Sequence, residues 1–190
     1  MKSSAIPVFR FDTEKTMAMM HRFMVALGEV SVKKLMKLLY LADKWHLNQY
    51  GRLISGDRYF AAPYGPVPSV TLAVLENKNR YVKQAVKIGA VESPADLKRI
   101  RDFFVVVEDS ISNGANDCPY EGRLSSSDRM AIDHVLDEFG RLNEQQIVDY
   151  THSLGEYKEV CSGGQIKYSS MMDCPTAESE ASYRLHICSL

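Results

Sequence analysis

The fold is decided by residues 33–69, which read KKLMKLLYLADKWHLNQYGRLISGDRYFAAPYGPVPS. The stretch predicts a long helix, a turn, a short extended piece and a second helix that begins at a Gly-Pro corner. On a helical wheel, one broad face collects the apolar residues Val32, Leu35, Met36, Leu38, Leu39, Ala42 and Trp45. A face that covers roughly half of the circle is typical of a central helix with several packing neighbours.

The same helix has a start signal, a stop signal and a basic stripe. The hydroxyl of Ser31 can accept a hydrogen bond from a free backbone N–H of the first turn, and Gly51 follows Tyr50 as a C-terminal signal. Opposite the apolar face lie four lysines, Lys33, Lys34, Lys37 and Lys44. The simplest interpretation of this stripe is a solvated face, and the alternative is a surface for an acidic partner or for the DNA backbone.

Two polar side chains lie where the wheel expects core. His46 falls near the middle of the apolar face, and Asp43 lies toward its edge. Because residues i and i+3 are neighbours on a helix, the sequence predicts that the Asp43 carboxylate meets the His46 imidazole. Three interpretations are open: a buried histidine with structural hydrogen bonds, a polar contact for partner recognition, or an acid–base pair in a pocket.

Glycine and proline divide the segment that follows. Gly51 and the step Gly56-Asp57 flank a turn, and residues 58–62 have the aromatic content of a strand. In the corner Tyr64-Gly65-Pro66, the glycine precedes a proline and is pushed away from helical backbone angles. We therefore expect a stiff corner, with the proline at or near the start of a helix over residues 67–75.

These residues resemble the signature of the SocA-like, Panacea-domain antitoxin family. That signature is a leucine-rich helix ending in a Tyr-Gly turn, then a Gly-Asp step and a Tyr/His-Gly-Pro-Val corner. Its counterparts here are Leu38–Leu41, Tyr50-Gly51, Gly56-Asp57 and Tyr64-Gly65-Pro66-Val67. The likeness is strong over residues 31–75 and continues weakly at Leu124-Ser125, Thr151-His152 and Ile166–Met172.

The resemblance implies a small, mainly helical protein of bacterial or prophage origin that neutralises a toxin by binding it directly. The resemblance does not imply any catalytic residue in this chain. The residues that it marks as structural or partner-binding are Asp43, Trp45, His46, Tyr50, Gly51, Gly56, Asp57, Tyr64, Gly65 and Pro66.

Composition and charge narrow the class of protein further. The chain has 190 residues, of which 45% are hydrophobic, so we expect an N-terminal arm over residues 1–11 and a single domain over residues 12–190. With a net charge of −1, no global charge draws it to nucleic acid or to a membrane. The absence of a signal peptide and of a long apolar run predicts a cytoplasmic protein.

Caps, glycines and apolar spacing predict the other elements. Helices are expected from Asp12 or Thr13 to Leu27, from Pro94 to Asp102, from Ser125 or Ser126 to Gly140, from Asn143 through Tyr150, and from Pro175 onward. The methionine stripe of the first helix fits either core or an adaptable binding surface. Residues 103–107 give the strongest strand signal, with residues 58–62 as a possible partner, and residues 110–122 read as a surface loop. The predicted fold class is mainly α: a single compact helical domain with a small antiparallel β element.

No chemistry-bearing motif stands out. The sequence has no nucleotide-binding, hydrolase or metalloprotease motif, and its four cysteines lie far apart without a CxxC pair. We therefore predict no enzyme activity, no cofactor and no metal site, and, by resemblance, an antitoxin that binds a cognate toxin protein. The alternatives are a nucleic-acid-binding regulator, an adaptor that hands a bound protein to a protease, and an enzyme that uses the surroundings of His46 and Asp43.

Overall fold

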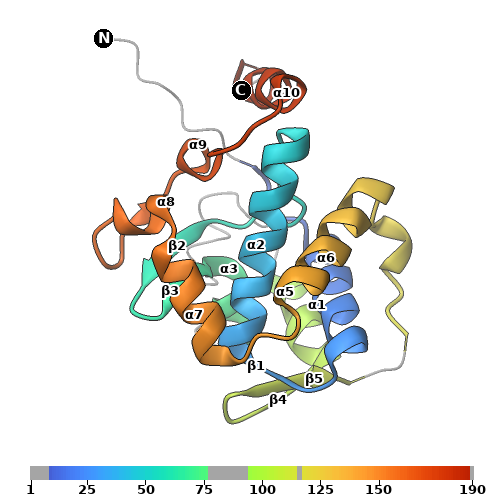
Figure 1. The fold of residues 1–190 in the computed structure, drawn as a ribbon. Coiled ribbons are helices and arrows are strands. Elements are labelled where there is room, and N and C mark those ends of the chain that lie inside the picture. The colour runs from blue at the N-terminus through green and yellow to red at the C-terminus, as the bar shows by residue number, and fades with distance from the viewer. Residues whose placement is uncertain (1–8, 77–93, 115–116, 189–190) are drawn as a thin grey trace.

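Helix α2 (Val32–Tyr50) runs through the middle of the molecule, and the other helices pack around it (Figure 1). The structure is a computed structural model that describes residues 9–76, 94–114 and 117–188. The helices that pack most closely on α2 are α1 (Thr13–Leu27), α6 (Ser126–Phe139), α7 (Glu144–Ser153), α9 (Tyr168–Met171) and α10 (Ala177–Cys188). The prediction of a central helix in a mainly α fold is thus confirmed.

The predicted caps are present at the ends of the main helices. The Ser31 hydroxyl accepts from the backbone of the first turn of α2, and Gly51 follows the helix with a left-handed φ of 69°. Asp12 caps α1 in the same way. Ser125 and Asn143 each form a capping box, at the starts of α6 and α7. These local signals fix where each helix enters the packed core.

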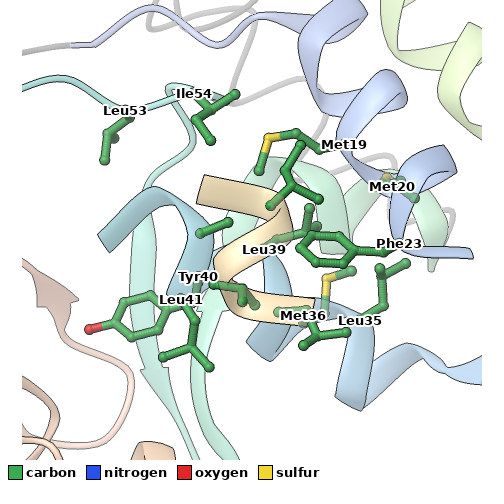
Figure 2. Close-up of a cluster of buried hydrophobic side chains, with 14 of the residues drawn as sticks. Met19, Met20, Phe23, Leu35, Met36, Leu39, Tyr40, Leu41, Leu53 and Ile54 are labelled. Atoms are coloured by element: carbon green, nitrogen blue, oxygen red, sulfur yellow. The ribbon is translucent and has the colours of Figure 1, made fainter. Parts of the chain in front are cut away.

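One part of the hydrophobic core lies where α1 meets α2 (Figure 2). Its fully buried members include Met19, Met20 and Phe23 from α1 and Leu35, Met36 and Leu39 from α2. The methionines of α1 are therefore core residues, which decides between the two interpretations of that stripe. Tyr40 points to the other side of α2 from Phe23, toward the later helices (Figure 2).

Two small antiparallel sheets complete the fold and confirm the predicted β element. One has the order β3-β2-β6, formed by Gly65–Pro68, Tyr59–Ala62 and Gln165–Ile166. The other has the order β1-β5-β4, formed by Val30–Ser31, Ser110–Asn113 and Phe104–Val107.

The predicted pairing of residues 103–107 with residues 58–62 is wrong. β4 pairs instead with β5, directly after a turn in which Glu108 has a φ of 53°. Residues 110–113, expected as loop, are therefore strand. A hairpin closes a much shorter loop than a pairing with residues 58–62 would require, so the local partner is favoured.

The Gly-Pro corner lies in a hairpin, not at the start of a helix. Gly65 pairs with Ala62 across β2 and β3, and Pro66 is a strand residue. The helix α3 (Ser69–Leu75) begins only after Pro68. β3 is an edge strand of its sheet, where a proline without an N–H is tolerated.

The remaining elements are short. They are α5 (Pro94–Phe103), the 3-10 turn Glu121–Arg123 and α8 (Gly155–Lys158). The described part of the N-terminal arm packs on the domain: Phe11 is buried, and the ring centroids of Phe9 and Tyr168 are 5.1 Å apart. Residues 1–8 lie outside the described chain. The last helix begins at Ala177, two residues after the predicted Pro175. In the part of the chain that the structure describes, each helix is too short or too polar to cross a membrane.

Candidate functional site

Asp43 is the centre of a buried hydrogen-bond network that fixes the turn after α2. Its carboxylate accepts from the backbone N–H groups of Ile54 (2.7 Å) and Ser55 (3.0 Å). It also accepts from the hydroxyl groups of Ser55 and Tyr59, the latter at 2.7 Å. Burial raises the pKa of Asp43, and these hydrogen bonds oppose the shift. The carboxylate therefore ties α2 to the turn and to β2.

Asp57 closes the same turn and caps α3 from outside the helix. Its carboxylate accepts from the backbone N–H groups of Val70 and Thr71, both at 2.9 Å, and from the Thr71 hydroxyl at 2.8 Å. These N–H groups belong to the first turn of α3, which has no side-chain cap of its own. Burial raises the pKa of Asp57 to about 6, against the effect of the hydrogen bonds. The preceding Gly56 lies against the Arg10 carbonyl, so this turn also holds the N-terminal arm.

His46 has a different carboxylate partner from the one that the wheel predicts. Its Nδ1 lies 2.8 Å from the Arg52 carbonyl oxygen, and its Nε2 lies 3.1 Å from Ser127 Oγ and 3.2 Å from Asp128 Oδ1. The predicted pair with Asp43 is therefore wrong, because the turn after α2 already occupies that carboxylate. His46 instead joins α2 to the first turn of α6.

At this junction, the Asp128 carboxylate has three side-chain partners that carry nitrogen atoms. Its carboxylate lies 2.7 Å from Lys15 Nζ and 3.2 Å from Arg52 Nη1, in addition to His46. It also completes the capping box with Ser125. Burial alone raises the pKa of Asp128, but the hydrogen bonds from His46, Lys15 and the Ser125 backbone outweigh burial and lower the pKa below its ordinary value. The cluster clamps α1, α2 and α6 together.

The junction contains a serine, a histidine and an aspartate without the arrangement of a catalytic triad. In a triad, the carboxylate meets one ring nitrogen and the serine meets the other. Here Ser127 and Asp128 both face Nε2 of His46, and a backbone carbonyl occupies Nδ1. The imidazole is fully buried, with the Tyr50 ring 4.7 Å away. Among the described residues, no group of three or more His, Cys, Asp or Glu side chains is placed to hold a metal ion.

The three glycines of the motif, Gly51, Gly56 and Gly65, have positive φ angles and close neighbours that exclude a side chain. A Cβ on Gly51 would collide with the Ser179 carbonyl, so the glycine lets α10 lie directly on the end of α2. Gly65 has a φ of 100°, and its Cβ would lie 2.8 Å from Thr151 Oγ1 and 3.0 Å from Lys37 Cε. It lets the β2–β3 hairpin pack against α7 and α2.

The prediction that the four lysines form a solvated stripe is wrong. Lys37 is only 1% exposed and donates to the Pro66 carbonyl at 2.9 Å, under the β2–β3 hairpin. Burial lowers the pKa of Lys37 to about 7. At the tip of the hairpin, Tyr64 is 59% exposed, and the Lys33 ammonium lies 4.9 Å from its ring centroid.

The other lysines of the stripe also have partners from later in the chain. Lys44 lies between Glu156 (2.5 Å) and Asp173 (2.7 Å), and Glu156 also accepts from the Tyr40 hydroxyl at 2.6 Å. The remaining pairs are Lys33 with Glu144 (3.1 Å) and Lys34 with the Gly140 carbonyl (2.7 Å). The stripe therefore does not offer four free cations to a DNA backbone.

A groove of about 220 Å³ lies beside Lys44, between α2 and α6. One wall carries Trp45 and His134, whose rings are 5.0 Å apart. Another carries Phe139 and Tyr150, whose rings are 4.7 Å apart. The groove is thus a partly exposed surface feature with aromatic walls, unlike the buried networks around Asp43, Asp57 and His46.

The third wall of the groove comes from the segment between α9 and α10, which contributes Asp173 and Cys174. Asn48 holds this segment against α2. Its side-chain amide donates to the Met171 carbonyl at 2.8 Å, and its side-chain oxygen accepts from the Cys174 N–H at 2.9 Å. Asn48, together with the Lys44–Asp173 ion pair, therefore fixes this wall against α2.

A comparison with known protein families identifies the stretch around α2. The family described as antitoxin SocA-like, Panacea domain, matches residues 35–157, about two thirds of the chain. The chain belongs to this family. No curated protein and no solved structure gives a match. The match contains all ten motif residues and ends in α8, before the segment that carries Asp173.

Within the SocA-like Panacea domain, the motif residues divide between scaffold and surface. Asp43, His46 and Asp57 are buried and hydrogen-bonded to other parts of the domain, whereas Trp45 lines the groove. The sequence did not identify Asp128, whose one signal is its place three residues after a capping serine. It also gave no sign of the groove residues on α6 and α7, since only the tertiary packing brings them to α2.

Proposed function

We propose that this chain is the antitoxin of a toxin–antitoxin pair and that it neutralises its toxin by binding it directly. The observation that carries the proposal is membership of the SocA-like, Panacea-domain antitoxin family over residues 35–157. The geometry is compatible with a binding role, because the buried polar groups of the motif are satisfied by hydrogen bonds within the domain and serve its architecture.

The groove between α2 and α6 is the surface that we assign to the toxin. Trp45 belongs to the motif and lies in the groove, and Tyr150 opposite is exposed. Tryptophan and tyrosine are enriched among the residues that dominate binding energy at protein interfaces. Trp45 is partly buried against the core and lines the groove, so it offers a partner an aromatic surface that is held in place.

Co-expression with the protein encoded beside it tests the proposal. We expect the two proteins to elute together in size-exclusion chromatography at micromolar concentration, and growth arrested by the neighbouring protein alone to be restored. Separate elution together with no recovery of growth would refute direct neutralisation.

A pair of variants tests the assignment of the surface. Trp45→Ala should weaken the complex by about 2 kcal/mol, roughly thirtyfold in Kd, because it removes a central aromatic anchor. Val25→Ala is the matched control, since Val25 is an exposed apolar residue on α1 outside the groove. Thermal melting of both variants distinguishes a lost contact from a lost fold. An equal effect of the two variants on binding would place the toxin elsewhere.

A further inference from the structure

The groove combines aromatic rings with exposed carboxylates. The side chains of Glu138 and Asp173 are 54% and 52% exposed, and both line the groove together with Trp45 and Tyr150. A cation is attracted to the face of an aromatic ring and forms its strongest hydrogen bonds with a carboxylate. The groove therefore has two kinds of group that favour positive charge.

The Lys44 ammonium and the His134 imidazole, which both line the groove, already have carboxylate neighbours. The Lys44 side chain is only 11% exposed, and its ammonium lies between Asp173 and Glu156. His134 Nε2 lies 3.6 Å from Glu138 Oε1. An anionic ligand would have to displace these contacts, whereas a cation would meet carboxylates that still face solvent.

The carboxylates around Tyr150 act on its phenol in one direction. Burial is the largest cause that raises the pKa of Tyr150; Lys44 lowers this pKa, and the carboxylates of Glu138, Asp173 and Glu156 raise it. Burial disfavours any charge at this ring, so the carboxylates are the part of the surroundings that would favour a positive group.

We propose that the groove binds an arginine or lysine side chain from a basic segment of the partner protein. The proposal rests on the proposed function for the identity of that partner as the toxin. The volume of about 220 Å³ is below the ~300–1,000 Å³ of pockets that enclose a drug-sized ligand, and it suits one long side chain of a docked protein. The ammonium or guanidinium lies between Trp45 and Tyr150 and pairs with Glu138 and Asp173.

Trp45 makes the test independent of the toxin, because it is the one tryptophan of the chain and its fluorescence reports on the groove. The probes are three capped peptides at low salt, containing three arginines, three citrullines or three glutamates. Citrulline keeps the shape of arginine without its charge. We expect the arginine peptide to change the Trp45 emission with saturation, the citrulline peptide to bind at least about threefold more weakly, and the glutamate peptide to have no effect.

Two matched variants separate the groove from general surface charge. Glu138→Gln removes a carboxylate of the groove, and Glu159→Gln removes an exposed carboxylate at the end of α8. The arginine peptide should bind Glu138→Gln about threefold or more weakly than wild type and Glu159→Gln as well as wild type. Equal binding of the arginine and citrulline peptides, equal effects of the two variants, or an unchanged Trp45 signal at millimolar peptide would each overturn the inference.

The two proposals fail separately. Saturable arginine binding without growth recovery in the co-expression assay would refute the antitoxin role and retain the cation-binding groove. Growth recovery together with a silent Trp45 titration would refute the cation-binding groove and retain the antitoxin role.

Discussion

Asp43 and Asp128 are both fully buried carboxylates near the C-terminal half of α2, but they are stabilised in opposite ways. Asp43 accepts hydrogen bonds from neutral backbone and hydroxyl donors, and its pKa is raised. Asp128 accepts from Lys15 and Arg52 as well as from His46, and its pKa is lowered. The comparison teaches that neutral donors do not outweigh the cost of burying a carboxylate, whereas cationic partners do.

The largest effect should follow from Asp128→Ala. The change leaves Lys15, Arg52 and His46 without their shared acceptor and removes the capping box of α6. Breaking a buried charge cluster from one side typically costs ~3–5 kcal/mol; because the Lys15 and Arg52 side chains reach solvent, we expect about 3 kcal/mol. Urea unfolding measures it. A loss below about 1 kcal/mol would mean that the cations do not depend on this carboxylate.

Asp43→Asn should cost less, about 1–3 kcal/mol. The amide keeps one acceptor oxygen for the N–H groups of Ile54 and Ser55 but turns its NH2 group toward the hydroxyl groups of Ser55 and Tyr59. The donors around Asp43 are neutral, so the variant leaves no cation without a partner. The loss of stability should therefore equal that of one or two hydrogen bonds. If the same unfolding experiment gives a larger loss than Asp128→Ala, the distinction between neutral and charged partners is wrong.

The pH dependence of stability should separate the two kinds of carboxylate. Asp57, which like Asp43 has neutral donors, has a pKa of about 6 in the folded state against an ordinary value of 3.8. Between these values the folded chain keeps a proton that the unfolded chain releases, so stability from Asp57 falls as the pH rises from 3.8 to 6. Asp128 has the opposite sign, because its contribution is lost as the pH falls below the ordinary value.

The Asp57 contribution is measured by determining the free energy of unfolding of wild type and of Asp57→Asn between pH 3.8 and 6 and taking the difference at each pH. The difference should decrease with rising pH. A difference that grows toward pH 6 would show that the Asp57 hydrogen bonds outweigh burial after all.

The smallest effect near neutral pH should come from Lys37→Met. Methionine has a similar length and removes a buried group whose pKa is about 7, at the cost of one hydrogen bond to Pro66 of about 1 kcal/mol. Because the unfolded lysine stays protonated up to 10.5, wild type should gain stability over the variant as the pH rises from 7 to 10.5. Thermal melting at both ends of this range measures the gain. A constant difference would mean that Lys37 is charged in the folded state.

The sequence predicted what depends on neighbouring residues. The extent of α2, the caps Ser31 and Ser125, and the left-handed Gly51 all follow from local rules and are confirmed. It predicted that His46 is buried but assigned its partner from the nearest carboxylate on the same helix. The observed partner, Asp128, comes from another helix, and no spacing within α2 indicates it.

The prediction that the lysine stripe is solvated was wrong for a related reason. A helical wheel separates apolar from charged residues, and it assumes that the charged side faces water. Here the β2–β3 hairpin covers Lys37, and Glu156 and Asp173 approach Lys44. Lysine has a long apolar stem that can be buried when a carbonyl or carboxylate meets its end. Whether a lysine stripe is solvated depends on where acceptors from distant parts of the chain lie in the fold. The spacing of residues within α2 does not predict those positions.

The groove is built from two parts of the chain, which Asn48 helps to hold together. The helices that form two of its walls belong to the region shared with the family, whereas Asp173 and Cys174 follow the end of that region and are held against α2 by the Asn48 side chain and by the Lys44–Asp173 ion pair. Asp173 and Cys174 are exposed, so substitutions at these two positions would change one wall while the buried residues of α9 and α10 keep their places in the core. Two members with the same core and different residues here would then present different binding surfaces, so partner choice could diverge in evolution while the fold stayed constant.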